Sequence, residues 1–259
     1  MEKLSTGSRI NYAKDDAAGQ AISTRLSAEI QGLAMASRNA ADAQSLIDTA
    51  EGGMQETHNV LLRMRELAVQ SANGTLTDAD RQHTDAEFKQ LQNEMDRISY
   101  NTKWAGQNLL DGRSFSFQVG EGANQTINVN IGGVSSYNPV SMTATTFDGV
   151  RYDYGNGGSI ELDTVSQSQR AIEAIDIAID YVSSERANLG AVSNRLDSTM
   201  SNLDQVAVNL SASQGRIQDT DFAQETGNLA KNQILQQAAT AMIAQANASK
   251  SSVLTLVRG

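Results

Sequence analysis

Two apolar seams with a spacing of seven residues lie near opposite ends of the chain. The first consists of Leu26, Leu33, Ala40, Ile47, Met54, Leu61 and Ala68, and the second of Ile175, Val182, Leu189, Leu196, Leu203 and Leu210. A repeat of seven keeps apolar side chains on one side of a helix, and such a stripe is buried only against another helix. The two seams are therefore predicted to pair with each other across the residues between them.

The composition favours long helices over a thick hydrophobic core. Hydrophobic residues make up 39% of the chain and aromatic residues 5%, and Ala, Ser, Asn, Gln and Thr fill the difference. This balance suits elongated helices, which have a high ratio of surface to volume. The net charge of −10 argues against sequence-independent binding to nucleic acid, because such binding requires a basic face.

Several kinds of site and segment are excluded by what the sequence lacks. The chain has no cysteine, which excludes disulfides, thiolate metal sites and cysteine nucleophiles. No apolar run reaches the roughly 18 residues that span a bilayer, so no membrane partner is expected. The N-terminus has no basic-then-apolar secretion signal, so either export would follow another route or the signal is missing from this sequence.

Residues 1–103 are predicted to form the N-terminal part of a helical core. Asp15 or Asp16 can cap a long helix over about 16–72. After an Asn-Gly turn, a short helix is predicted over about 77–99. A short antiparallel partner of the long helix is the most economical arrangement for this second helix.

Residues 104–162 are predicted to form a small β region, because Gly, Asn, Ser and Thr become frequent there. Apolar residues alternate over 115–119 and again over 127–131, with a glycine-rich stretch between them, which is typical of a β-hairpin. A second hairpin is expected between 150–154 and 160–162, joined by a Gly-Asn-Gly-Gly turn.

Helix is predicted again over 163–213, as the C-terminal long helix of the core. Asp221 and Gln224 can form a capping box at the start of a terminal helix within 214–259. This last helix is rich in Ala, and its apolar face has no obvious partner inside the chain. The predicted fold is therefore mainly α: an elongated antiparallel helical bundle or coiled coil from both chain ends, with a small β-hairpin region in the middle.

The sequence offers no convincing constellation for catalysis or for metal binding. His58 and His83 lie in separate helical segments without further ligands, and no zinc motif is present. The Gly-Glu-Gly at 120–122 is not followed by the Lys and Ser or Thr of a phosphate-binding loop. No nucleophile with a base and an orienting group was found, so the chain is predicted not to be an enzyme and to need no cofactor.

Three parts of the sequence carry long motifs: LSTGSRIN and AKDDAAG within residues 4–19, RMRELAVQSAN at 63–73, and IQDTDFA at 217–223 with the tail to Arg258. These motifs resemble those of bacterial flagellin, the subunit of the flagellar filament. Several long motifs in the same order along the chain are a specific signal. The resemblance covers roughly residues 4–133 and 163–258.

The resemblance implies a secreted structural protein of the bacterial flagellum or cell surface that serves motility and assembles with copies of itself into an open helical filament. Terminal helices would line an inner tube through coiled-coil contacts, in which small side chains permit tight packing. The self-assembly helix would use Phe222, Leu229, Leu235, Ala238, Ala241, Met242 and Leu254. Flagellins also have a further helical stretch, which would precede Met1, pair with this helix and carry the export signal.

The resemblance implies further partners as well. A flagellar export chaperone and cap or junction proteins are expected. Many flagellins are bound by an innate immune receptor of the Toll-like type. The positions that match its recognition surface are Arg63, Leu67 and Glu87.

Two alternative functions stay open at this point. One is a hook–filament junction protein, built on the same terminal helices. The other is a flagellin-like surface protein that binds a polysaccharide, such as a surface glycan, or a host surface. Its candidate contacts are Trp104, Tyr137, Tyr152 and Tyr154.

Overall fold

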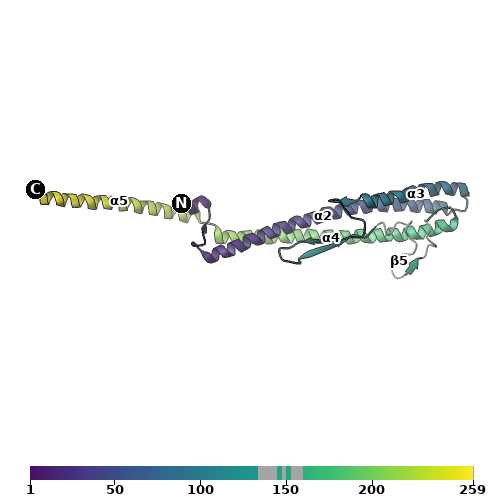
Figure 1. The fold of residues 1–259 in the computed structure, drawn as a ribbon, viewed down its shortest axis with the longest axis horizontal. Coiled ribbons are helices and arrows are strands. Elements are labelled where there is room, and N and C mark those ends of the chain that lie inside the picture. Colours follow the sequence, from purple (N-terminus) through teal and green to yellow (C-terminus); the bar gives the residue numbers. More distant parts are fainter. Residues whose placement is uncertain (134–144, 148–149, 153–159, 259) are drawn as a thin grey trace. The chain divides into compact units, whose positions relative to one another are not determined.

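The computed structural model describes residues 1–133, 145–147, 150–152 and 160–258 of the chain. Its helices, labelled in part in Figure 1, are α1 (Glu2–Thr6), α2 (Ala17–Ser71), α3 (Asp78–Asn101), α4 (Val165–Gln218) and α5 (Phe222–Arg258). Its strands are β1 (Lys103–Trp104), β2 (Gln107–Asn108), β3 (Ser114–Gln118), β4 (Thr126–Asn130), β5 (Thr145–Phe147) and β6 (Val150–Tyr152). The chain divides into two compact units, one formed by Gly32–Asp204 and the other by Met1–Gln31 with Gln205–Gly259.

In the Gly32–Asp204 unit, α2 and α4 lie side by side and run in opposite directions (Figure 1). The Nε2 of Gln44 donates to the Oγ of Ser193 at 2.6 Å, and residues further along α2 contact residues earlier in α4. Thus Arg65 pairs with Asp176 at 2.6 Å near the far end of the two helices. The predicted pairing of the two seams is confirmed in this unit, because their members between Leu33 and Leu203 are all buried.

The short helix α3 begins with a complete capping box. The Thr77 side chain accepts a hydrogen bond from the Asp80 backbone, and the Asp80 carboxylate accepts one from the Thr77 backbone. Arg81 is 6% exposed, and its guanidinium donates to the carbonyl oxygens of Ser71, Asn73 and Leu76 at 2.5, 3.1 and 2.9 Å. These carbonyls belong to the end of α2 and to the turn after it, where no N–H of the next helical turn is available to donate to them. One buried guanidinium therefore fixes the turn between α2 and α3.

The predicted hairpin is confirmed: β3 and β4 pair antiparallel, with Phe115 opposite Val129 and Phe117 opposite Ile127. Val129 and Ile127 are buried, so this face of the hairpin packs into the core. A smaller hairpin, β1–β2, was not predicted. Its two-residue turn places both Ala105 and Gly106 at positive φ, at 48° and 82°. Positive φ at both positions is the geometry of a type I′ turn.

The second predicted hairpin is wrong in its pairing. β6 does form within the expected 150–154 segment, but it pairs with β5 and not with residues 160–162. Leu162 is held in irregular backbone instead: its N–H donates to the Asp85 carboxylate at 2.8 Å, and its carbonyl accepts from the Ser71 hydroxyl at 2.9 Å. Because the Leu162 N–H and carbonyl already bond to side chains of α3 and α2, they cannot pair with a strand. Tyr137, Tyr154 and the Gly-Asn-Gly-Gly turn lie outside the described residues.

The ends of the long helices agree with the predictions at the N-terminus and differ at the C-terminus. Asp16 caps α2, since its Oδ1 accepts from the Gly19 N–H at 2.8 Å. The helix α4, expected to end near residue 213, continues through Gly215 to Gln218. A glycine inside a helix costs only about 1 kcal/mol, which tertiary contacts can offset. The Gln218 side chain supplies such a contact by accepting from the Ser23 hydroxyl at 2.9 Å.

Candidate functional site

The helix α5 is the candidate site for self-association, and its start is well defined. The Oδ1 of Asp221 accepts from the backbone N–H groups of Ala223 and Gln224, at 2.9 and 3.3 Å. This is the first half of the predicted capping box, in which the side chain at the cap satisfies free backbone donors. The chain therefore enters α5 from a fixed cap rather than from a frayed end.

Along α5 the large apolar side chains face solvent. Every side chain over residues 230–248 is exposed. The exposed fractions are 56% for Phe222, 65% for Ile234, 55% for Leu235, 74% for Met242 and 61% for Ile243. An apolar stripe of this kind on a long helix normally contacts another helix or another subunit.

The side chains on α5 that were predicted for self-assembly occupy more than one face of the helix. Leu235, Ala238 and Met242 follow a spacing of three and four, so they share one face. Phe222 and Leu229 are seven apart and share a second face, on which Leu229 is half-buried. Ala241 is exposed as well. Leu254 belongs to α5, but its side chain lies outside the described part of the chain.

Two exposed residues of α5, Ile234 and Ile243, were missed by the sequence prediction. Ile234 lies four residues before Ala238 and so extends the first face, and Ile243 extends the second face, because it lies two heptads beyond Leu229. The heptad spacing itself was the signal that could have found Ile243. Between residues 222 and 248 only Glu225 and Lys231 are charged, so α5 lacks the charges of an ordinary solvated face.

The predicted receptor-contact positions lie on α2 and α3. Arg63 donates from Nε and Nη2 to Glu87 at 3.0 and 2.8 Å, and from Nη1 to Glu66 at 2.8 Å. The Glu87 hydrogen bonds, followed by those to Glu66, raise the pKa of Arg63. Arg63 and Glu87 are half-exposed, but Leu67 is 1% exposed and belongs to the core. Leu67 faces the inside of the bundle, so of the three predicted positions Arg63 and Glu87 are the ones whose side chains are accessible.

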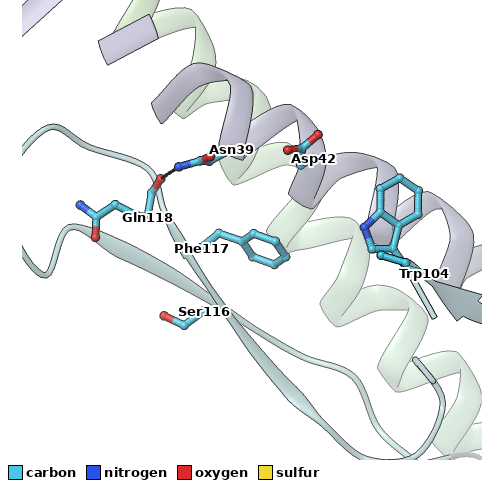
Figure 2. Close-up of a pocket in the computed structure, with 7 residues that line it drawn as sticks. Asn39, Asp42, Trp104, Ser116, Phe117 and Gln118 are labelled. Carbon is cyan, nitrogen blue, oxygen red and sulfur yellow. Dashed lines mark hydrogen bonds between the residues drawn. The ribbon is translucent and has the colours of Figure 1, made fainter. Parts of the chain in front are cut away.

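A shallow cleft of about 690 Å³ lies between α2 and the two hairpins (Figure 2). Asn39 and Asp42 of α2 line one side, Trp104 lies at the β1–β2 turn, and Phe117 comes from β3. The Asn39 Nδ2 donates to the Gln118 carbonyl at 3.0 Å, which ties the hairpin to α2. Figure 2 shows the Phe117 ring on the Trp104 side of β3, with the Gln118 side chain turned away, as strand alternation requires.

An ionic cluster joins α3 to the segment that precedes α4. Lys89 lies 2.7 Å from the Asp85 carboxylate and 3.3 Å from that of Glu161. Burial, followed by the charges of Asp85 and Glu161, raises the pKa of Asp163. The cluster ties the segment before α4 to α3. Among the described residues, no group of three or more His, Cys, Asp or Glu could hold a metal ion.

No helix within the described ranges is both long and apolar enough to cross a membrane.

Comparisons with known families and proteins agree with the motifs at both ends of the chain. The family described as the bacterial flagellin N-terminal helical region matches residues 1–114, and the bacterial flagellin C-terminal helical region matches residues 172–257. The flagellar filament 33 kDa core protein of Treponema phagedenis is 42% identical over 270 residues, covering 100% of this chain and 91% of that protein. Flagellin of Bacillus subtilis is 41% identical over 286 residues, with the same coverage of 100% and 91%.

Solved structures give a similar result for the fold. The crystal structure of Bacillus cereus flagellin has a TM-score of 0.54 at 30% identity and covers 68% of this chain and 94% of its own. A putative flagellar hook-associated protein from Vibrio parahaemolyticus has a TM-score of 0.64 and covers 79% of this chain and 100% of its own. At 17% identity the second structure shares the fold only.

Proposed function

The chain belongs to the bacterial flagellin family and is a structural subunit of the flagellar filament, and on that premise we propose that its copies assemble through α5. One observation carries the proposal. Over residues 230–248, α5 exposes every side chain, including Ile234, Leu235, Met242 and Ile243. Burying apolar surface is favourable, so cover by a neighbouring subunit would stabilise this helix.

The two faces of α5 suit contact with more than one neighbour. Leu235 and Met242 would pack on one neighbour, and Phe222 with Ile243 on another. Alanines such as Ala238 and Ala241 let a second helix approach closely. Contacts between different patches of identical subunits build an open helical filament when the rotation between neighbours does not close into a ring.

The test replaces apolar residues of α5 in the full-length protein and measures polymerisation by sedimentation and electron microscopy. Leu235→Glu with Met242→Glu is expected to abolish filaments, because it places charge on the first face. Leu235→Met with Met242→Leu exchanges the two side chains and keeps the first face apolar at the same positions. This control is expected to polymerise. Filaments from the first variant at wild-type yield would overturn the proposal.

We also propose that the chain works outside the cell, in the filament, and that an export chaperone covers α5 before assembly. An uncovered apolar stripe promotes premature association, which supports a need for cover. At the filament end, the same helix would meet cap or junction proteins. Binding of the flagellar export chaperone to wild-type protein, and its loss in Leu235→Glu with Met242→Glu, would test the first of these contacts. Equal binding by both proteins would remove α5 from the chaperone site.

An innate immune receptor of the Toll-like type is a further proposed partner, through Arg63 and Glu87. Their half-exposed ion pair at 2.8 Å supports this, since a planar guanidinium and a carboxylate are suited to a polar interface. Arg63→Ala with Glu87→Ala is expected to weaken binding to the receptor ectodomain. Arg97→Ala with Glu94→Ala removes a comparable exposed pair on α3 and serves as the control.

The cleft at Trp104 supports a second candidate function, binding of a surface glycan. Two aromatic rings, Trp104 and Phe117, lie beside the carboxylate of Asp42 and the amide of Asn39. Aromatic faces pack on the apolar faces of sugars, while carboxylates and amides bind hydroxyl groups. Calorimetry against surface polysaccharide is expected to show heat for wild-type protein and none for Trp104→Ala. Tyr100→Ala, at an exposed aromatic residue outside the cleft, is the control.

A further inference from the structure

The two terminal motifs pair with each other at the corner between α4 and α5. Ser8 and Asp219 form an antiparallel bridge. The Arg9 N–H donates to the Gln218 carbonyl at 2.7 Å, and the Thr220 N–H donates to the Gly7 carbonyl at 3.0 Å. All of these residues belong to the unit formed by Met1–Gln31 and Gln205–Gly259. The corner is therefore held by the N-terminal motif and not by a local turn alone.

Arg9 adds a side-chain connection to this backbone pairing. Its Nη2 donates to the Ile217 carbonyl at 2.9 Å and lies 3.7 Å from the Asp16 carboxylate. The last carbonyls of a helix have no partner within the helix, and a positive charge near them is stabilising. Asp16 in turn caps α2 through the Gly19 N–H. One arginine thus connects the end of α4 with the start of α2.

The rest of the corner leaves little freedom. Gly7 has a φ of +71°, a conformation that glycine adopts without strain, and its carbonyl is the one that accepts from Thr220. Ile10 is 3% exposed, and a Cβ added to Gly19 would lie 2.7 Å from its Cδ1. The close approach of these two residues fixes the N-terminal segment against the beginning of α2.

We infer that Arg9 is a positioning residue for filament assembly. By holding the segment from Ile217 to Thr220, Arg9 sets where and in which direction α5 leaves α4, one residue before the Asp221 cap. The direction of α5 within its unit decides which of its apolar faces a neighbour can reach. This inference rests on the proposed role of α5. It assigns a function to the motifs within residues 4–19 and at 217–223, which lie largely outside the proposed assembly surface.

The experiment compares Arg9→Ala with Arg25→Ala in the full-length protein. Arg25 lies on the same unit in an exposed pair with Glu29 at 3.5 Å, away from the corner. Polymerised fraction is measured by sedimentation, filament shape by electron microscopy, and protection of the Thr220 N–H by hydrogen exchange. A rescue arm uses Ser8→Cys with Asp219→Cys, which is unambiguous because the chain has no cysteine. Residues paired across an antiparallel bridge have the Cα spacing that a disulfide requires.

We expect Arg9→Ala to lower the polymerised fraction or change the filament shape, and to speed exchange at Thr220 about threefold to fivefold. Amides within Gly32–Asp204 should exchange as in wild type. Oxidation of the cysteine pair in the Arg9→Ala background should restore assembly and protection, whereas the reduced pair should not. Arg25→Ala should match wild type throughout.

Two results would overturn the inference. The first is assembly, filament shape and Thr220 exchange in Arg9→Ala that equal those of Arg25→Ala. The second is a loss of assembly in Arg9→Ala that the oxidised cysteine pair does not repair, which would mean that Arg9 contacts a neighbouring subunit directly. Failure of the proposed assembly surface would give a different result, because Leu235→Glu with Met242→Glu would still polymerise. The exchange rate at Thr220 would then still show whether Arg9 holds the corner.

Discussion

The seam of the Gly32–Asp204 unit and the apolar stripe of α5 share a sequence pattern but differ completely in burial. Leu61 is 0% exposed, whereas Met242 is 74% exposed. Both lie on long helices with apolar residues at heptad spacing. The difference is that the seam finds a long partner helix within the same chain, while the five-residue helix α1, which contacts α5, leaves residues 230–248 exposed. One pattern therefore serves folding in the first region and suits the proposed association in the second.

The largest expected effect separates these two regions directly. Leu61→Ala should lower the free energy of unfolding by about 2–5 kcal/mol, because it leaves a cavity in a fully buried site. Its neighbour Leu62 is 43% exposed, so Leu62→Ala is the matched control and should lower it by less than about 1 kcal/mol. Met242→Ala should change the value by no more than about 0.5 kcal/mol in unpolymerised protein. Urea denaturation provides the measurement, and equal effects at Leu61 and Leu62 would contradict the assigned burial.

The next effect compares two arginines that each satisfy carbonyls at the end of a long helix. Arg81 is buried and serves three carbonyls, whereas the side chain of Arg9 is 54% exposed. Arg81→Ala should destabilise the protein by about 2–3 kcal/mol, since it leaves buried acceptors without donors. Arg9→Ala should cost less than about 1 kcal/mol, since water replaces the lost contacts. Thermal unfolding measures both, with Arg81→Lys as an intermediate variant, and a larger loss at Arg9 would reverse the comparison.

Much of the helical architecture was accessible from the sequence, because heptad seams and caps are local signals. The Asp16 cap and the pairing of the seams both follow from residue spacing. The partner of β6 could not be predicted in the same way. It depends on the backbone of Leu162 being bonded to Asp85 and Ser71, which are distant in the sequence. Hydrogen-bond competition of this kind leaves no local pattern.

The candidate site was predicted only in part, for two physical reasons. A match to a family motif gives the position of a residue but not its exposure, and so Leu67 matches a position of the receptor surface although its side chain is buried. On α5, the absence of a partner helix was visible, but the assignment of side chains to faces needed helical geometry. That geometry separates Phe222 from Leu235 and adds Ile243.

A smaller effect is expected at the turns of the two hairpins, where two residues share a positive φ but differ in residue type. Ala105 has a φ of 48° and Asn124 a φ of 66°. Asparagine tolerates this conformation better than alanine, and Asn-Gly is the preferred pair in a type I′ turn. Ala105→Asn should therefore raise the free energy of unfolding by about 1 kcal/mol, and Asn124→Ala should lower it by about the same amount. Urea midpoints of the two variants should move in opposite directions, and a shift of the same sign would contradict the φ values.

The smallest effect concerns two carboxyl groups whose pKa values move in opposite directions. Burial, with Asp85 and Glu161 nearby, raises the pKa of Asp163, so the folded state binds this proton more tightly than the unfolded state does. Stability is then lost as the pH rises from the ordinary aspartate value through the raised one. Asp163→Asn should relieve this penalty above that range, by less than about 1 kcal/mol, and should match wild type below it. Asp80→Asn provides the opposite case, because hydrogen bonds from Thr77 lower the pKa of Asp80. That variant should lose stability at neutral pH and approach wild type in acid, so parallel pH profiles for the two variants would refute the assignment.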